Sequence, residues 1–169
     1  MSVPLAEALA VAEMLVRRLA PWTTRAEIAG SIRRRAAVVR DIEIVAVPAR
    51  AITIFDDRPM LDELREVARI WGRTPKAGDR YIQVEDVLGS DLTLDLFLVH
   101  EPAEWGPIYA IRTGPAAFSQ MLVSKIKGRL WHCHDGWVAD ELGARVPCPE
   151  ESDFFAAARV AWAPPDLRR

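Results

Sequence analysis

Apolar side chains recur at helical spacing in several segments of the chain. The first such segment has Pro4 in its opening turn and ends at Pro21, as helix boundaries commonly do. The turn-forming run Thr113-Gly114-Pro115 separates two later helical segments. The predicted helices span residues 4–20, 57–70, 105–112, 116–127 and 150–158.

Other segments have the period of two that is typical of strands, in which successive side chains point to opposite faces. The turn-rich sequence PKAGD joins two of them, and Asp135-Gly136 suggests the turn of a hairpin. The predicted strands span residues 25–29, 41–47, 70–74, 80–87, 91–99, 129–134 and 136–140. This mixture of helices and strands predicts an α/β fold, with a subdomain boundary near residues 100–114.

Composition narrows the classes of protein that fit. The chain has 169 residues, half of them hydrophobic, which is enough to form a globular core. No apolar run is long enough to span a bilayer, and the acidic N-terminus lacks the basic leader of a signal peptide. Cys133 and Cys148 do not form a disulfide framework, which favours a reducing, cytoplasmic location.

The charge of the chain is segregated, although its net value is only −2. A net charge this small excludes a basic nucleic-acid coat protein, so any polyanion has to bind to local patches. The basic clusters are Arg33, Arg34, Arg35 and Arg40, and further along Lys125, Lys127 and Arg129.

Acidic residues occur inside two apolar strands. Asp41 and Glu43 point to the same side of one strand, and Asp95 lies in the run LTLDLFLV. A carboxylate in such a setting is costly unless it is paired or bound to a cation. Arginine partners are one explanation. The other is an oxygen-rich site for Mg²⁺ or Mn²⁺, in which two ions about 3.5–4 Å apart hold the oxygens of a phosphoryl transfer.

The segment before these acids is suited to phosphate binding. Gly30 permits a close approach of the backbone or a positive φ, and Ser31 offers a hydroxyl group and a backbone N–H. Arginines 33–35 are able to neutralise a triphosphate. The arginines and the acids therefore serve one substrate in this interpretation, through its phosphates and through metal ions.

Four motifs resemble the family X DNA polymerases, the group of DNA polymerase beta. Gly30-Ser31-Ile32-Arg33-Arg34 followed by Asp41-Ile42-Glu43 is similar to the family's GSxRR…DxD, and Leu94-Asp95-Leu96 to its third-carboxylate strand. Ile111-Arg112-Thr113-Gly114 resembles the aromatic-pair-Thr-Gly motif beside the sugar, and residues 150–168 resemble the closing segment of the thumb.

The resemblance implies a nucleotidyltransferase palm with a mixed sheet at residues 1–112 and a small α+β thumb at 113–169. It implies a monomer that adds nucleotides to a DNA 3′-hydroxyl in template-directed gap filling, releasing pyrophosphate. Asp41, Glu43 and Asp95 are then the catalytic ligands of two Mg²⁺ or Mn²⁺ ions. The implied nucleotide-binding residues are Gly30, Ser31, Arg34, Ile111, Arg112, Thr113 and Gly114. Template-independent tailing, transfer to RNA or protein, and a non-catalytic DNA-end-binding module remain alternatives.

The chain departs from the family pattern at several positions. Glu43 replaces the usual second aspartate, and Ile111 with Arg112 replaces the aromatic pair that crowds the 2′ position of the sugar. The second change predicts weak discrimination between deoxyribonucleotides and ribonucleotides. The family bends sharply after the glycine, and proline makes a cis bond cheap, so Gly114-Pro115 is predicted to be cis.

Residues of the predicted thumb are candidates for DNA contacts. Lys125, Lys127 and Arg129 are suited to phosphate groups, although a solvated helix end explains them equally well. His134 is a further candidate, because family thumbs touch the template and minor groove in this region. His132-Cys133-His134 with Cys148 matches no usual zinc spacing.

Overall fold

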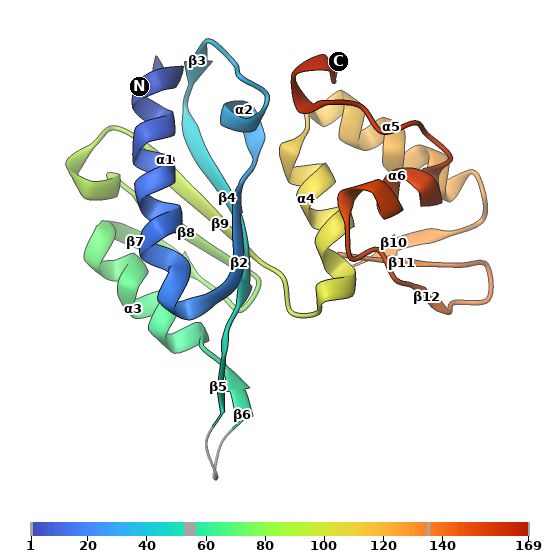
Figure 1. Ribbon diagram of the computed structural model, residues 1–169, viewed down its shortest axis with the longest axis horizontal. Helices are drawn as coiled ribbons and strands as arrows, with labels where there is room; N and C mark the ends of the chain where they lie inside the picture. Colours follow the sequence, from blue (N-terminus) through green and yellow to red (C-terminus); the bar gives the residue numbers. More distant parts are fainter. Residues whose placement is uncertain (1, 53–56, 135, 169) are drawn as a thin grey trace. The chain divides into compact units, whose positions relative to one another are not determined.

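The chain divides into two compact units, Met1–His100 and Glu101–Arg169 (Figure 1). The computed structural model describes residues 2–52, 57–134 and 136–168. Each unit has its own hydrophobic core.

The first unit is built on a five-stranded sheet with the order β2-β4-β9-β8-β7. Only β4 and β9 run parallel, and the other neighbouring strands are antiparallel. The mixed α/β class expected from the sequence is therefore confirmed. The strands are β2 (Thr23–Ile28), β4 (Asp41–Pro48), β7 (Arg73–Ala77), β8 (Tyr81–Glu85) and β9 (Thr93–Leu98).

Two helices, α1 (Leu5–Leu19) and α3 (Leu61–Trp71), cover the same face of this sheet (Figure 1). Alternate strand residues such as Ile42, Ile44 and Leu94 point toward these helices and are fully buried. Burial of these side chains is the main force that holds the layers together. Because strand side chains alternate, the residues between them point to the opposite face, and that face carries the polar groups.

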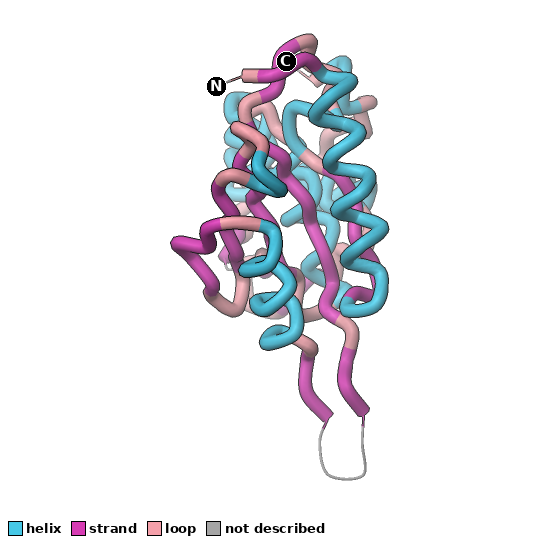
Figure 2. Tube along the Cα trace, turned by 90° about the vertical axis from the view of Figure 1, so that its left-hand side faces the viewer, coloured by secondary structure: helices cyan, strands magenta, loops and turns pink. Residues whose placement is uncertain are grey.

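Short elements complete the first unit. Strands β5 and β6 pair as an antiparallel ribbon, which extends away from the helices of the first unit (Figure 2). The short strands are β1 (Val3–Pro4), β3 (Val38–Val39), β5 (Arg50–Ile52) and β6 (Asp57–Pro59). The short helices are η1 (Ala20–Trp22), α2 (Gly30–Arg33) and η2 (Val87–Gly89).

The second unit packs three α-helices and two short 3-10 helices with a small antiparallel sheet. The helices share one core, in which Phe118, Phe154 and Phe155 are buried. The helices are η3 (Pro102–Glu104), α4 (Trp105–Thr113), α5 (Ala116–Lys127), α6 (Glu151–Ala158) and η4 (Pro165–Leu167). The strands are β10 (His132–His134), β11 (Trp137–Ala139) and β12 (Arg145–Val146).

The boundary between the units lies at His100–Glu101, within the predicted region 100–114, and not at residues 112–113, where the motif comparison placed it. The expected position falls at the end of α4. That helix packs on α5 and α6, and its Ala110 belongs to the core of the second unit. A cut inside α4 would divide this core.

Three predicted elements differ from the structure. The strand expected at 129–134 begins at His132, because residues 129 and 130 form a turn after α5. The helix expected from Asp57 begins at Leu61, because residues 57–59 form strand β6. The strand expected at 70–74 is displaced to 73–77, since Ile70 and Trp71 complete α3 and Trp71 is buried beneath it. Gly72 ends the helix. A Cβ atom there would lie 2.3 Å from the backbone oxygen of Glu85, so only glycine fits.

Across residues 2–52, 57–134 and 136–168, no helix combines the length and apolar character that crossing a membrane requires.

Candidate functional site

The three predicted carboxylates lie on one face of the first unit. Glu43 of β4 and Asp95 of β9 are register partners in the parallel pair, and Asp41 is two residues before Glu43. Partners in register, and residues two apart on a strand, point to the same side of a sheet. All three side chains are half-buried, and they lie on the face away from α1 and α3.

The pKa of Asp41 reflects both its burial and the charged residues around it. Burial raises the pKa of Asp41, and the nearby charge of Asp95 raises it further. A backbone hydrogen bond and the charges of Arg34 and Arg40 offset these effects only in part. A bound cation would favour the charged form of this carboxylate.

Asp95 is held by two side chains of the neighbouring strand β8. The Tyr81 hydroxyl donates to Asp95 Oδ1 at 2.5 Å, and the Gln83 side-chain amide donates to the same oxygen at 3.1 Å. Sequence reasoning missed both residues. The alternation in Tyr81-Ile82-Gln83-Val84 places them on one face, but only the register of β8 against β9 shows which residue they face.

The Gly30-Ser31 turn lies directly against Glu43. Gly30 has a φ of +61°, and a Cβ atom at this position would lie 1.8 Å from Glu43 Oε2. The backbone N–H of Ala29 donates to the Glu43 carbonyl at 2.8 Å, which fixes the turn to β4. This position therefore requires glycine for two independent reasons: its backbone conformation and the closeness of the carboxylate.

Ser31 and Arg34 follow this turn. The Ser31 hydroxyl is buried, and within the described part of the chain it has no hydrogen-bond partner. A buried hydroxyl of this kind is available to donate to a further acceptor. Arg34 caps α2 through its backbone N–H, and its positive charge acts on Asp41.

The carboxylates have the right chemistry for a divalent cation, but they are not gathered around one point. Among residues 2–52, 57–134 and 136–168, no three His, Cys, Asp or Glu side chains are arranged to hold a metal ion. The fit of a metal therefore depends on three observations: the shared face, the repulsion at Asp41, and the turn at Gly30. Oxygen ligands of this type suit Mg²⁺ or Mn²⁺.

The remaining predicted nucleotide-binding residues belong to the second unit. Ile111, Arg112 and Thr113 form the last turn of α4, and Gly114 caps it with a φ of +64°. The peptide bond between Gly114 and Pro115 is cis, as predicted. Thr113 is buried, and Arg112 is exposed.

A pocket of about 380 Å³ lies beside Ile111 in this unit. Its other lining residues come from α5 and are mostly polar, and the Ser119 hydroxyl donates to the Ile111 carbonyl at 2.9 Å. The pocket is lined by Ile111, Ser119, Gln120, Val123, Ser124 and Lys127.

The predicted DNA-contacting residues divide into two groups. Lys125, Lys127 and His134 are exposed, as a phosphate contact requires. Arg129 is occupied within its own unit, because it donates to the Ala157 carbonyl at 2.5 Å and lies 3.7 Å from the ring centre of Trp131. Arg129 therefore has a structural role.

The two cysteines do not resemble nucleophiles. Burial raises the pKa of the Cys133 thiol, and burial raises that of Cys148 to about 11. Both thiols are therefore protonated at neutral pH, whereas nucleophilic attack requires the thiolate.

Comparison with known proteins adds no family to this picture. No model of a protein family matches the chain, and no curated protein is significantly similar to it in sequence.

Proposed function

We propose that this chain is a metal-dependent nucleotidyltransferase that adds nucleotides to a DNA 3′-hydroxyl, in template-directed gap filling with release of pyrophosphate. In this proposal the first unit is the palm and the second is the thumb. The observation that carries the proposal is the shared face of Asp41, Glu43 and Asp95 on the parallel strands β4 and β9.

The acids of this face have distinct roles in the proposed reaction. Asp41 and Glu43 bind the divalent ions that carry the triphosphate, and Asp95 is the acid nearest the primer 3′-hydroxyl. The repulsion between Asp41 and Asp95 supports this assignment, because it favours cation binding. When bound, the ions stabilise the charge that develops on the attacking and leaving oxygens.

The Gly30 turn is proposed to bind the triphosphate. Its closeness to Glu43 places the backbone and Ser31 beside the acids. The buried Ser31 hydroxyl would then donate to a phosphate oxygen, and Arg34 would neutralise phosphate charge. Catalysis of this kind depends mostly on the positioning of reactants and on charge stabilisation.

Primer extension on DNA with a one-nucleotide gap tests the proposal. Each dNTP and each NTP is supplied separately with Mg²⁺ or Mn²⁺. We expect the templated nucleotide to be added, with weak preference for the deoxy form because Ile111 and Arg112 replace an aromatic pair. Addition without regard to the template would indicate tailing. No addition under any condition would contradict the proposal, and nucleotide binding without transfer would then favour a binding module.

A further inference from the structure

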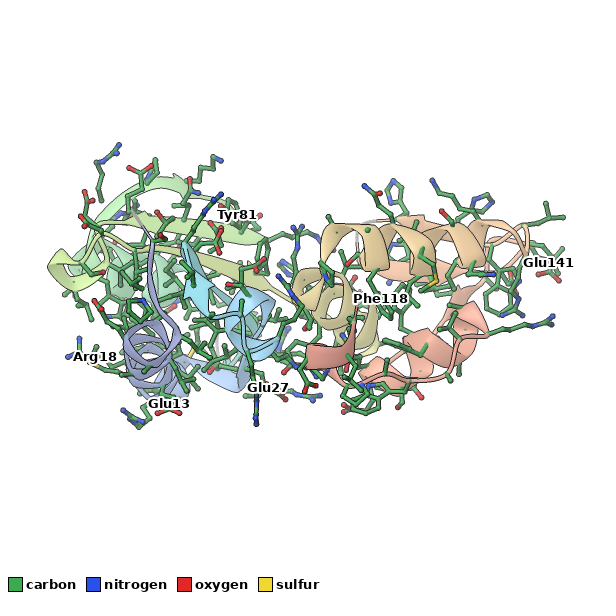
Figure 3. All side chains as sticks on the ribbon, turned by 90° about the horizontal axis from the view of Figure 1, so that it is seen from above. Glu13, Arg18, Glu27, Tyr81, Phe118 and Glu141 are labelled. Atoms are coloured by element: carbon green, nitrogen blue, oxygen red, sulfur yellow. The ribbon has the colours of Figure 1, made fainter. Side chains whose placement is uncertain are left out.

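On the polar face, two side chains donate hydrogen bonds to the same oxygen of Asp95. Both donors, the Tyr81 hydroxyl and the Gln83 amide, come from β8 and reach Oδ1. In the sheet, β9 lies between β8 and β4, so the donors approach Asp95 from the side opposite Asp41 and Glu43. Figure 3 shows Tyr81 on the side of the sheet away from Glu13 and Arg18 of α1.

We propose that Tyr81 and Gln83 are positioning residues, which fix Asp95 through Oδ1 and leave Oδ2 for a cation shared with β4. This inference rests on the proposed function, because it assumes that Asp95 is a metal ligand. Partners that hold a ligating carboxylate set its orientation, and their loss typically weakens metal affinity or activity about 10–100-fold.

The two donors are themselves held in place by the sheet. Gln83 is the register partner of Asp95, so its side chain starts directly opposite. Tyr81 is the partner of Phe97, two residues further along, and the two rings stack with their centres 5.2 Å apart. The Lys76 ammonium lies 5.5 Å from the ring centre of Tyr81, on the side of β7. The hydroxyl therefore has a fixed position when it reaches Asp95.

A purely structural explanation is that the donors satisfy a half-buried carboxylate. Loss of the Tyr81 hydroxyl would then lower the stability of the fold and leave metal binding unchanged. The proposal makes the opposite prediction, since the rings of Tyr81 and Phe97 remain stacked in Tyr81→Phe. Metal binding and folding stability must therefore be measured on the same variants.

The test uses the full chain, and Mn²⁺ alone is the probe. Free Mn²⁺ is followed by electron paramagnetic resonance as protein is added, and thermal unfolding is recorded in parallel. In Tyr81→Phe we expect the Kd for Mn²⁺ to rise about 10–100-fold. Tyr109→Phe is the matched control: the other tyrosine of the chain lies in the second unit against Trp105 and should keep the original Kd.

Two further readings complete the experiment. Gln83→Met removes the longer hydrogen bond at similar volume and should raise the Kd by less, which keeps the test usable if Tyr81→Phe fails to fold. In primer extension, Tyr81→Phe should raise the half-saturating Mn²⁺ concentration and change the KM for dNTP less than twofold.

The outcomes separate this inference from the proposed function. If the unaltered chain binds Mn²⁺ and both variants bind it equally well, the positioning role is wrong and the proposed function stands. If the unaltered chain neither binds Mn²⁺ nor transfers nucleotides, the proposed function fails and the positioning role fails with it.

Discussion

The two units of the chain contain buried carboxylates in contrasting surroundings. In the second unit Glu151 is almost fully buried, and it accepts hydrogen bonds from Arg168 at 2.8 Å and from Trp162 at 2.9 Å. Arg168 also stacks over Phe155, 5.0 Å from the ring centre, and donates to the Ala163 carbonyl. These contacts fasten the C-terminal tail onto α6.

In the first unit the half-buried Asp41 lies near both another acid and two arginines, whereas Glu151 is paired with one arginine. The pKa of Asp41 is raised by burial and by Asp95, so the positive charges of Arg34 and Arg40 do not compensate it fully. The difference teaches how to distinguish structural from functional acids. Removing one partner of a matched buried pair is costly, whereas a carboxylate whose pKa is raised by burial and by a neighbouring acid is a candidate functional group.

The largest effect is expected when the matched pair is broken. Glu151→Ala leaves the Arg168 guanidinium buried without its carboxylate, and such losses lower the free energy of unfolding by about 3–5 kcal/mol. Urea denaturation followed by tryptophan fluorescence measures the change, because Trp162 reports on this contact.

A surface pair provides the control for this experiment. Arg145 and Glu101 are 3.0 Å apart, but both side chains are more than half exposed. Glu101→Ala should therefore lower the free energy of unfolding by less than about 1 kcal/mol. Equal losses in Glu101→Ala and Glu151→Ala would contradict the structural role of the buried pair.

Asp95→Asn tests the proposed functional acids of the first unit. Removal of this charge should reduce nucleotide transfer about 10²–10³-fold or more, the scale of losing one electrostatic group of a catalytic site. The fold should tolerate the change, because Tyr81 and Gln83 still have an oxygen to donate to. Single-turnover primer extension and a thermal melt measure the two effects. Asp91→Asn, an exposed acid just before β9, should keep full activity.

The sequence predicted the carboxylate face because strand alternation is a local property. Asp41 and Glu43 share a side in any strand, and most of the predicted strands that form the sheet were correctly placed. The Tyr81 and Gln83 contacts depend on register between strands, which local patterns do not encode.

The domain boundary illustrates a second limit. The motif at 111–114 resembles one that lies where the palm meets the thumb, and the border was therefore expected at residues 112–113. Tertiary packing decides the border instead, because α4 buries Ala110 against the helices that follow it. The exposed Ile70 also favoured a strand by propensity, yet it continues α3 because the helix buries its neighbour Trp71.

Gly30→Ala is expected to have an intermediate effect that joins fold and function. A positive φ costs a non-glycine residue about 1–2 kcal/mol. Gly89→Ala, at a φ of +78° with no atoms within 4 Å of the new Cβ, should show this cost alone. Gly30→Ala should lower the free energy of unfolding by more, because the Cβ atom also displaces Glu43 Oε2. If Gly30→Ala and Gly89→Ala lower the free energy of unfolding equally, and Gly30→Ala leaves primer extension unchanged, the turn at Gly30 has no functional contact.

Asp41→Asn should produce the smallest change, and it should be a gain in stability. The folded chain holds the proton of Asp41 more tightly than the unfolded chain, because its pKa is raised above 3.8. Stability therefore falls as pH rises from below 3.8 through the folded value, and the loss persists at neutral pH. Asparagine removes this penalty, so the variant should have a slightly higher melting temperature at pH 7.

The pH and metal dependence of this gain identify its cause. Below pH 3.8 Asp41 is protonated in both states, so the two melting temperatures should converge there. Saturating Mg²⁺ should raise the melting temperature of the unaltered chain more than that of Asp41→Asn, because a ligand bound only by the folded state stabilises it. A variant that melts lower at pH 7 and responds equally to Mg²⁺ would show that Asp41 is a structural acid like Glu151, and the contrast between the two units would disappear.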